Sequence, residues 1–221
     1  MVDPGDMWPE PHYNAGGRKH LHALGVIAVT YRAFQRNMDD IYKFYLRKQK
    51  VPDALMNAYY FSLDEGNRVS VLKGVCKEYE TDPKIFALVE NLAEYFYWCK
   101  NCRDELVHAE QYPALFGGAS DTITLTKRIG KTDPKTGYVA LSLQRIRGIA
   151  DKIETGKQQC VTVRIYLRWR GIPAGERRHS PLRFHMPESL PEILRVPKPL
   201  KLSLSPPDFP LPGYLRKPSQ G

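Results

Sequence analysis

Arg103, Asp104 and His108 place a cation, a carboxylate and an imidazole within a short stretch of a predicted helix. Histidine titrates near neutral pH and can act as a base or an acid, whereas arginine stays charged and binds phosphate with two parallel donors. Cleavage of RNA without a metal needs a base for the 2′-hydroxyl, a cation for the charged phosphorane and an acid for the leaving oxygen. We therefore take these three residues as the candidate catalytic group.

The segment 83–110 must position this group, because its helical pattern runs directly into it. Apolar residues recur there at steps of three and four: Ile85, Val89, Leu92, Phe96 and Cys99. The next step of four lands on Arg103, where a core residue is expected. A charged side chain at such a position needs a partner or faces a cleft. Asp104 and His108, four apart, share one adjacent face of the same helix.

The spacing of Arg103 and His108 resembles the R-x4-H motif of the HEPN superfamily. Its members are small helical bundles that include metal-independent ribonucleases, many of them toxins or phage-defence effectors. The residue after the arginine is usually polar in that family, as Asp104 is here. The resemblance implies that Arg103 and His108 are catalytic, that Asp104 orients or completes the site, and that cleavage leaves a 2′,3′-cyclic phosphate. It also implies a homodimer in which two motif helices face one cleft.

One departure limits what the resemblance implies about regulation. The toxins that are modified by a partner nucleotidyltransferase carry a tyrosine two residues after the histidine. In this chain Glu110 stands there and Tyr112 is displaced. Regulation by tyrosine modification is therefore not carried over.

Helix geometry adds a condition to the catalytic interpretation. On an ideal helix, residues five apart have Cβ atoms about 140° apart, so Arg103 and His108 are not expected to reach one ligand from a single straight helix. The long arginine stem, or the His108 of a two-fold partner, could close this gap. We therefore expect the catalytic protein to be a dimer.

A structural role for the same residues is the alternative. Arg103 could form an ion pair with Glu105, Glu110 or a facing helix, and His108 could simply end the helix, where a cationic imidazole suits the helix dipole. Several HEPN-like proteins are non-catalytic RNA-binding or assembly modules. The chain could accordingly be a helical adaptor that dimerises and recruits a protein partner through its C-terminal tail.

Three helices are predicted before and through the motif. A long amphipathic helix starts at Arg18 and stops at or before Pro52, since its apolar residues alternate gaps of three and four. The capping box Ser62 to Glu65 starts a second helix. Asp82-Pro83 supplies an N-cap and a first-turn proline for the third helix, which must stop at Tyr112-Pro113.

A β-hairpin and a last helix are predicted after the motif. Residues 122–126 and 139–143 alternate apolar and polar side chains on either side of a turn at 133–137. A fourth helix from Ser142 to Arg170 would close the bundle, although the alternation at 161–169 also fits a strand. The predicted fold class is all-α: an up-and-down four-helix bundle with a β-hairpin inserted before the last helix.

The chain divides into three parts by composition. Residues 1–17 are rich in proline and glycine and are expected to be a flexible leader. Residues 18–171 form the HEPN-like helical bundle. Residues 172–221 hold eleven of the eighteen prolines and few hydrophobic residues, so a disordered, basic, proline-rich tail is predicted.

Basic residues give the chain a formal net charge of +9, and most of the excess lies within 18–171. Such a charge suits a polyanionic partner such as RNA, although a solvated lysine-rich surface fits it equally well. Lys127, Arg128 and Lys131 cluster on the predicted hairpin. We take them as candidate nucleic-acid-binding residues.

Cysteine usage and hydropathy favour a cytoplasmic protein that needs no metal or cofactor. The four cysteines are scattered through predicted helices, which fits reduced thiols better than a disulfide framework. Cys99 and Cys102 could form half of a zinc site or a redox pair, but no second pair follows. The longest apolar run, 23–29, is too short to cross a membrane, and no basic-then-apolar leader is seen.

Overall fold

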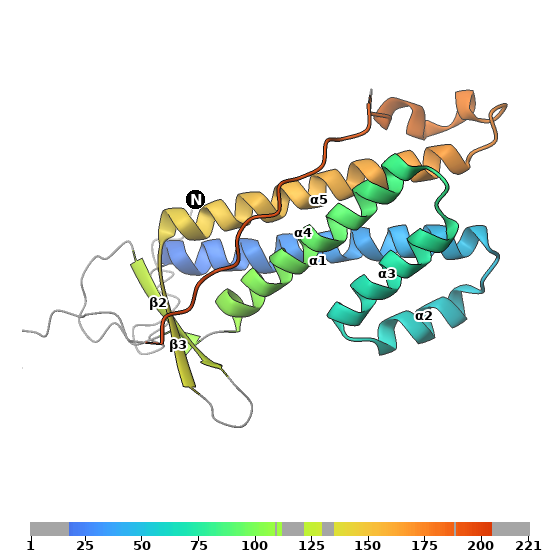
Figure 1. Ribbon diagram of the computed structural model, residues 1–221. Coiled ribbons are helices and arrows are strands. Elements are labelled where there is room, and N and C mark those ends of the chain that lie inside the picture. Colours follow the sequence, from blue (N-terminus) through green and yellow to red (C-terminus); the bar gives the residue numbers. More distant parts are fainter. Residues whose placement is uncertain (1–17, 109, 112–121, 130–134, 188, 205–221) are drawn as a thin grey trace, which may run out of the picture.

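The computed structural model describes residues 18–108, 110–111, 122–129, 135–187 and 189–204. This part of the chain is mostly helical, with five α-helices and a small antiparallel hairpin (Figure 1). The prediction of a mainly helical chain with a hairpin before the last helix is confirmed. The structure differs from the predicted set of four helices, because a fifth helix follows Pro52.

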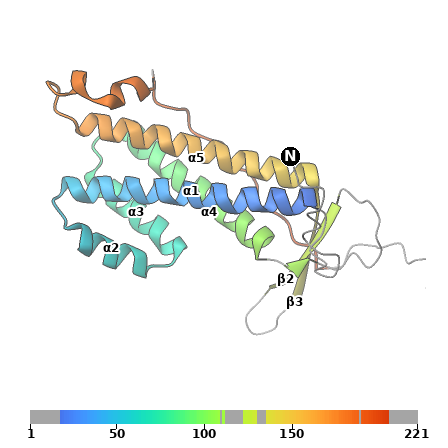
Figure 2. The ribbon, with the colours of Figure 1, turned by 180° about the vertical axis from the view of Figure 1, so that it is seen from behind.

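Three long helices form the body: α1 (Arg18–Lys48), α4 (Pro83–Val107) and α5 (Leu143–Gly171). In both views α1 and α5 lie side by side and run in the same direction, whereas α4 runs in the opposite one (Figures 1 and 2). The apolar stripe of α1 is buried along its whole length: Ala23, Ile27, Tyr31, Phe34, Met38, Ile41 and Tyr45. Val163 and Leu167 of α5 are also fully buried, which confirms that 161–169 is helical.

Gly156 lies where α5 comes closest to both α1 and α4. A Cβ atom at this position would be 2.8 Å from ring atoms of Phe34 on α1 and of Tyr95 on α4. Carbon atoms do not approach that closely without displacing one another. Glycine weakens a helix, but here it allows the three long helices to pack together.

Two short helices, α2 (Asp53–Ser62) and α3 (Glu65–Tyr79), pack at one end of the body (Figure 2). The sequence analysis missed α2, because Pro52 looked like the end of a helix, whereas it stands at the N-cap position of the next one. The predicted cap Ser62 is also wrong. Asp64 caps α3 by accepting a hydrogen bond from the Asn67 backbone N–H at 2.8 Å.

The other two predicted caps are confirmed. Asp82 accepts a hydrogen bond from the backbone N–H of Lys84 at 2.9 Å, at the start of α4. Ser142 accepts one from the backbone N–H of Arg145 at 3.2 Å, at the start of α5. α4 ends at Val107, earlier than the predicted stop at Tyr112-Pro113.

The hairpin consists of β2 (Thr122–Ile129) and β3 (Lys135–Ser142), which pair antiparallel with Thr122 opposite Ser142. A two-residue strand, β1 (Glu110–Gln111), pairs with the other edge of β2. The inward-facing residues of the hairpin are buried, as the alternation predicts: Ile123, Leu125, Val139 and Leu141. Lys135–Gly137, expected in the turn, belong to β3, and 130–134 lie outside the described residues.

The segment after α5 differs from the predicted disordered tail. Two short 3-10 helices, Arg177–His179 and Pro181–His185, follow α5. Residues 189–204, here called the strap, then run back along α4 and α5 to the sheet (Figure 1). Leucines of the strap pack against the core: Leu190, Leu194, Leu200 and Leu202. The predicted leader 1–17 and residues 205–221 lie outside the described residues.

Side chains of the body hold the strap by its backbone. Asn91 both donates to the carbonyl of Leu194 and accepts from its N–H, each at 2.9 Å. Trp98 Nε1 donates to the Lys198 carbonyl at 3.1 Å, and Gln159 Nε2 to the Glu192 carbonyl at 2.7 Å. Tyr138 of β3 and Ser203 exchange two backbone hydrogen bonds. These bonds satisfy an extended backbone that has no hydrogen bonds of its own.

All four cysteines are buried and carry free thiols. Burial raises the pKa of the Cys76 thiol to about 11 and that of Cys102 to about 12. None of the helices in the described ranges is long and apolar enough to cross a membrane.

Candidate functional site at the C-terminal end of α4

Arg103 lies in the last turns of α4 and points into the space between α1 and α3. The carbon of its guanidinium is 4.6 Å from the ring centroid of Tyr31 on α1. Its Nη2 donates to Oε2 of Glu65, the first residue of α3. Only 17% of its side chain is exposed. The arginine that interrupts the apolar stripe therefore has a partner on a facing helix, as the structural alternative predicts.

Glu65 is the residue of this group that the sequence analysis did not assign to the site. Its carboxylate accepts hydrogen bonds from the Tyr31 hydroxyl at 2.9 Å and from Gln35 Nε2 at 3.2 Å, in addition to Arg103. Burial, followed by the nearby Glu65 charge, raises the pKa of Tyr31 well above its ordinary value. Tyr31 therefore remains a hydroxyl donor, and Glu65 joins α1, α3 and α4 through one carboxylate.

His108 caps the C-terminal end of α4 and leaves the helical conformation, with φ −100° and ψ 3°. Its side chain is 61% exposed. Nη1 of Arg103 lies 3.1 Å from Nε2 of His108. The gap between these side chains is closed within one chain, because the arginine stem is long, the first of the two routes considered, and because His108 is not part of the straight helix. Both can act from a single chain.

The tautomer of the imidazole decides which nitrogen can accept a hydrogen bond from Arg103. A guanidinium can only donate hydrogen bonds. Nε2 of His108 can accept from Arg103 Nη1 only when that nitrogen carries no proton. In the tautomer with its proton on Nδ1, Nε2 is the basic nitrogen and faces the cation.

Asp104 lies beside the pair. Its Oδ1 is 3.0 Å from Nε of Arg103 and 3.9 Å from Nε2 of His108. Its Oδ2 accepts a hydrogen bond from Lys100 Nζ at 2.6 Å. The structure thus brings all three predicted catalytic residues together, with Asp104 closer to Arg103 than to His108.

Two of the three predicted nucleic-acid-binding residues belong to the hairpin, which lies at the C-terminal end of α4 (Figure 1). Lys127 and Arg128 belong to β2, and Lys131 lies outside the described residues. Burial raises the pKa of Glu105, and the charge of Lys127 opposes this shift. Lys127 is therefore close enough to α4 to act on a carboxylate next to the motif.

The described part of the chain contains no cluster of three or more histidine, cysteine or acidic residues that could hold a metal ion. No protein-family model, curated protein or solved structure matches the chain. The resemblance to the HEPN superfamily therefore rests on the motif and its setting in a helical protein.

Proposed function

We propose that the protein is a cytoplasmic, metal-independent endoribonuclease of the HEPN type, acting as a toxin or phage-defence effector. The observation that carries this proposal is the 3.1 Å contact between Nη1 of Arg103 and Nε2 of His108 at the exposed end of α4. The side chain of this histidine is 61% exposed, so a ligand can reach it. Phosphoryl transfer in RNA requires this pairing of a base with a fixed cation.

The reaction assigns a role to each residue. His108 takes the proton of a 2′-hydroxyl, the freed oxygen attacks the adjacent phosphorus, and the bond to the 5′-oxygen breaks. Arg103 stabilises the charge that develops on the phosphorane, held in place by Glu65 and Tyr31. The products are a 2′,3′-cyclic phosphate and a 5′-hydroxyl once an acid protonates the leaving oxygen. The phosphate takes the place of the direct Arg103 to His108 contact.

A homodimer remains part of the proposal, because the reaction needs an acid for the leaving oxygen as well as a base for the 2′-hydroxyl. A second His108 from a two-fold partner would supply it. Since Arg103 and His108 already meet in one chain, the dimer is no longer needed to bring the arginine to a histidine. It is needed only for the second proton transfer.

The test follows cleavage of end-labelled single-stranded RNA with a metal chelator present. We expect His108→Ala and Arg103→Ala to lower the cleavage rate by about 10²-fold or more, the range for removing a general base or an oxyanion donor. His179→Ala is the matched control, because that histidine is exposed on a 3-10 helix after α5. It should cleave at the wild-type rate, with cyclic phosphate ends.

Mixing wild-type subunits with an excess of His108→Ala subunits tests the composite site. A mixed dimer has one His108 and lacks either the base or the acid, so we expect activity to fall below the share of wild-type subunits. Activity in proportion to that share contradicts the role of the second His108 and leaves the pair within one chain.

A non-catalytic adaptor is the second candidate, because Arg103 has an ion-pair partner and an aromatic contact inside the chain. Its contacts with Glu65 and Tyr31 join three helices, which suffices to explain why an arginine stands in the core. Wild-type protein that leaves varied RNAs intact would contradict the ribonuclease and favour the adaptor. If the protein is an adaptor, His108→Ala should leave partner recruitment unchanged, and removal of the C-terminal segment should abolish it.

A further inference from the structure

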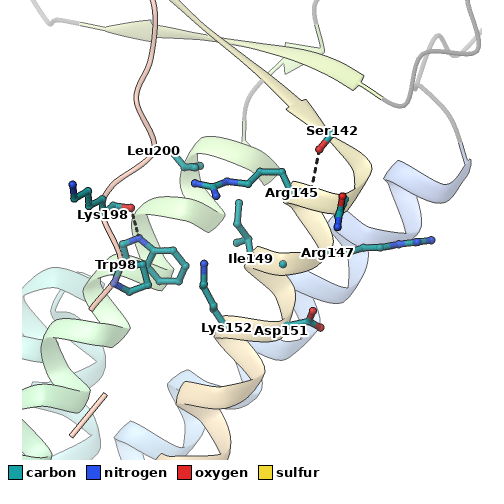
Figure 3. A pocket seen from close by; sticks show the side chains of 12 residues that line it. Trp98, Ser142, Arg145, Arg147, Ile149, Asp151, Lys152, Lys198 and Leu200 are labelled. Atoms are coloured by element: carbon teal, nitrogen blue, oxygen red, sulfur yellow. Dashed lines mark hydrogen bonds between the residues drawn. The ribbon is translucent and has the colours of Figure 1, made fainter. Parts of the chain in front are cut away.

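A pocket of about 590 Å³ lies between α4, the first turns of α5 and the strap (Figure 3). Trp98 and Ile149 form its apolar wall, and Leu200 closes the side formed by the strap. The volume is within the range of small-molecule sites. Trp98 and Arg103 are five residues apart on a helix, so they point to different sides of it.

Two cations reach into this pocket from one face of α5. Arg145 and Lys152 are seven residues apart, or about two turns, so they share a face of the helix. Figure 3 shows Arg145 extending toward Leu200 and Lys152 extending toward Trp98, so their charged ends approach the hollow from opposite sides. Within the described residues, neither side chain forms an ion pair. Both charges are therefore available to a ligand.

The other charged residues around the rim do not neutralise this pair. Asp151 and Arg147 also line the pocket, and Figure 3 shows their side chains on the other side of α5 from Trp98. Lys198 also directs its side chain outward, and its carbonyl accepts the hydrogen bond from Trp98 Nε1. The pocket thus combines an apolar wall with two cations on the side of Trp98, and its one labelled carboxylate, Asp151, extends to the other side of α5.

We propose that this pocket binds a small phosphate monoester with a flat apolar body. A monoester carries close to two negative charges near neutral pH, which matches one arginine and one lysine better than a single carboxylate does. The arginine fork suits phosphate oxygens, and the lysine supplies a second point charge. The apolar body lies against Trp98 and Ile149. Because α4, α5 and the strap enclose the hollow on three sides, a compact ligand fits it better than a continuous polymer does.

Isothermal titration calorimetry with 1-naphthyl phosphate tests this proposal on the full-length protein. We expect saturable binding of one molecule per chain. The double variant Arg145→Ala with Lys152→Ala should weaken binding at least tenfold. The matched control is Lys77→Ala with Lys84→Ala, which removes two exposed positive charges from α3 and from the start of α4. It should bind within twofold of wild type.

Gly148 provides a second variant that leaves the charges in place. It lines the pocket, and a Cβ at this position would meet no atom within 4 Å. Gly148→Leu therefore fills the hollow without straining α5, and a leucine is a better helix former than glycine. We expect this variant to lose naphthyl phosphate binding and to keep the wild-type melting temperature or exceed it.

Four results would overturn the proposal. The first is no binding of 1-naphthyl phosphate at millimolar concentration. The second is equal binding of 1-naphthol, which would mean that the cations contribute nothing. The third is unchanged binding in both pocket variants. The fourth is binding of single-stranded RNA, but not of naphthyl phosphate, through Arg145 and Lys152, which would make these residues part of a polymer-binding surface. None of these results depends on ribonuclease activity.

Discussion

The carboxylate of Glu80 accepts two hydrogen bonds from the guanidinium of Arg170, 90 residues further along the chain. The Tyr45 hydroxyl donates a third at 2.7 Å, and the Asp82 backbone N–H a fourth at 2.9 Å. The Glu80 side chain is 0% exposed. This one carboxylate ties the loop between α3 and α4 to the C-terminal ends of α1 and α5.

Glu80→Gln should destabilise the fold. The substitution keeps the shape of the side chain but removes its charge, so Arg170 loses its ion pair. The NH2 group of the new glutamine is a donor, and it would face the donors that now bind Glu80. We expect a loss of about 3 kcal/mol in the free energy of unfolding, near the lower end for breaking a buried pair, because Arg170 is 28% exposed and regains water. Urea denaturation of the two proteins measures this loss of unfolding free energy. Glu78→Gln, on the exposed side of α3, is the control and should change stability by less than about 0.5 kcal/mol.

The same carboxylate predicts how stability depends on pH. Burial alone would raise the pKa of Glu80, but the hydrogen bonds from Arg170, Tyr45 and Asp82 outweigh it and hold the pKa below the ordinary value of 4.5. The unfolded chain therefore binds this proton at higher pH than the folded chain does. The stabilisation that Glu80 contributes is complete at pH values above its ordinary pKa of 4.5, and it is lost as the pH falls through the lower pKa of the folded state.

Unfolding free energies measured from pH 6 down into the acid range check this sign. Wild type should lose stability more steeply below about pH 4.5 than Glu80→Gln does. Parallel curves for the two proteins would contradict the assignment of the low pKa to Glu80.

Gly156→Ala should destabilise the protein although alanine is the better helix former. The added methyl group would lie 2.8 Å from the rings of Phe34 and Tyr95, so the long helices must move apart. We expect a loss of about 1–3 kcal/mol, the usual cost of overpacking a core. Thermal unfolding followed by circular dichroism measures this loss.

Gly25→Ala on α1 is the matched control for this substitution. Its new methyl group would meet no atom within 4 Å. It should raise stability by up to about 1 kcal/mol, through helix propensity alone. A loss of similar size in both variants would show that the close approach at Gly156 is not the cause.

The strap should detach when Asn91 can no longer hold Leu194. Asn91→Asp keeps the acceptor but loses the donor to the Leu194 carbonyl. We expect faster hydrogen exchange at the Leu194 amide and, because Trp98 is only 6% exposed behind the strap, a red shift of its fluorescence.

Two controls separate this effect from a general loss of stability. Glu94→Gln, on the exposed side of α4, should leave both signals unchanged. Adding Trp98→Phe to Asn91→Asp should remove the red shift. Unchanged exchange at Leu194 in Asn91→Asp would contradict the role given to Asn91.

Local patterns predicted the long helices and the hairpin, because their signals lie within a few neighbouring residues. The three-four rhythm of α1 and the caps Asp82 and Ser142 are such signals. The start of α3 was misplaced by two residues, because Ser62 and Asp64 are both good caps and only the backbone path selects Asp64. The strap could not be predicted. Its backbone is satisfied by Asn91, which lies about a hundred residues earlier in the chain.

In the candidate site too, features that lie within a few neighbouring residues could be predicted, whereas contacts between distant segments could not. Arg103, Asp104 and His108 stand close together in the sequence, so the motif could be found there. Glu65 reaches Arg103 only through the packing of α3 against α4, 38 residues apart. The direct contact with His108 depends on where α4 ends, at Val107, and helix ends are hard to place from sequence.

The strap also has a consequence for how the protein is made. It leaves the ribosome after every helix, and its hydrogen bonds to Asn91 and Trp98 span 103 and 100 residues. Contacts between such distant residues close late in folding, so each nascent chain passes through a stage in which this groove is empty. At that stage the strap of a neighbouring chain can meet the same unpaired Asn91 and Trp98, so the strap is the segment through which two chains would exchange.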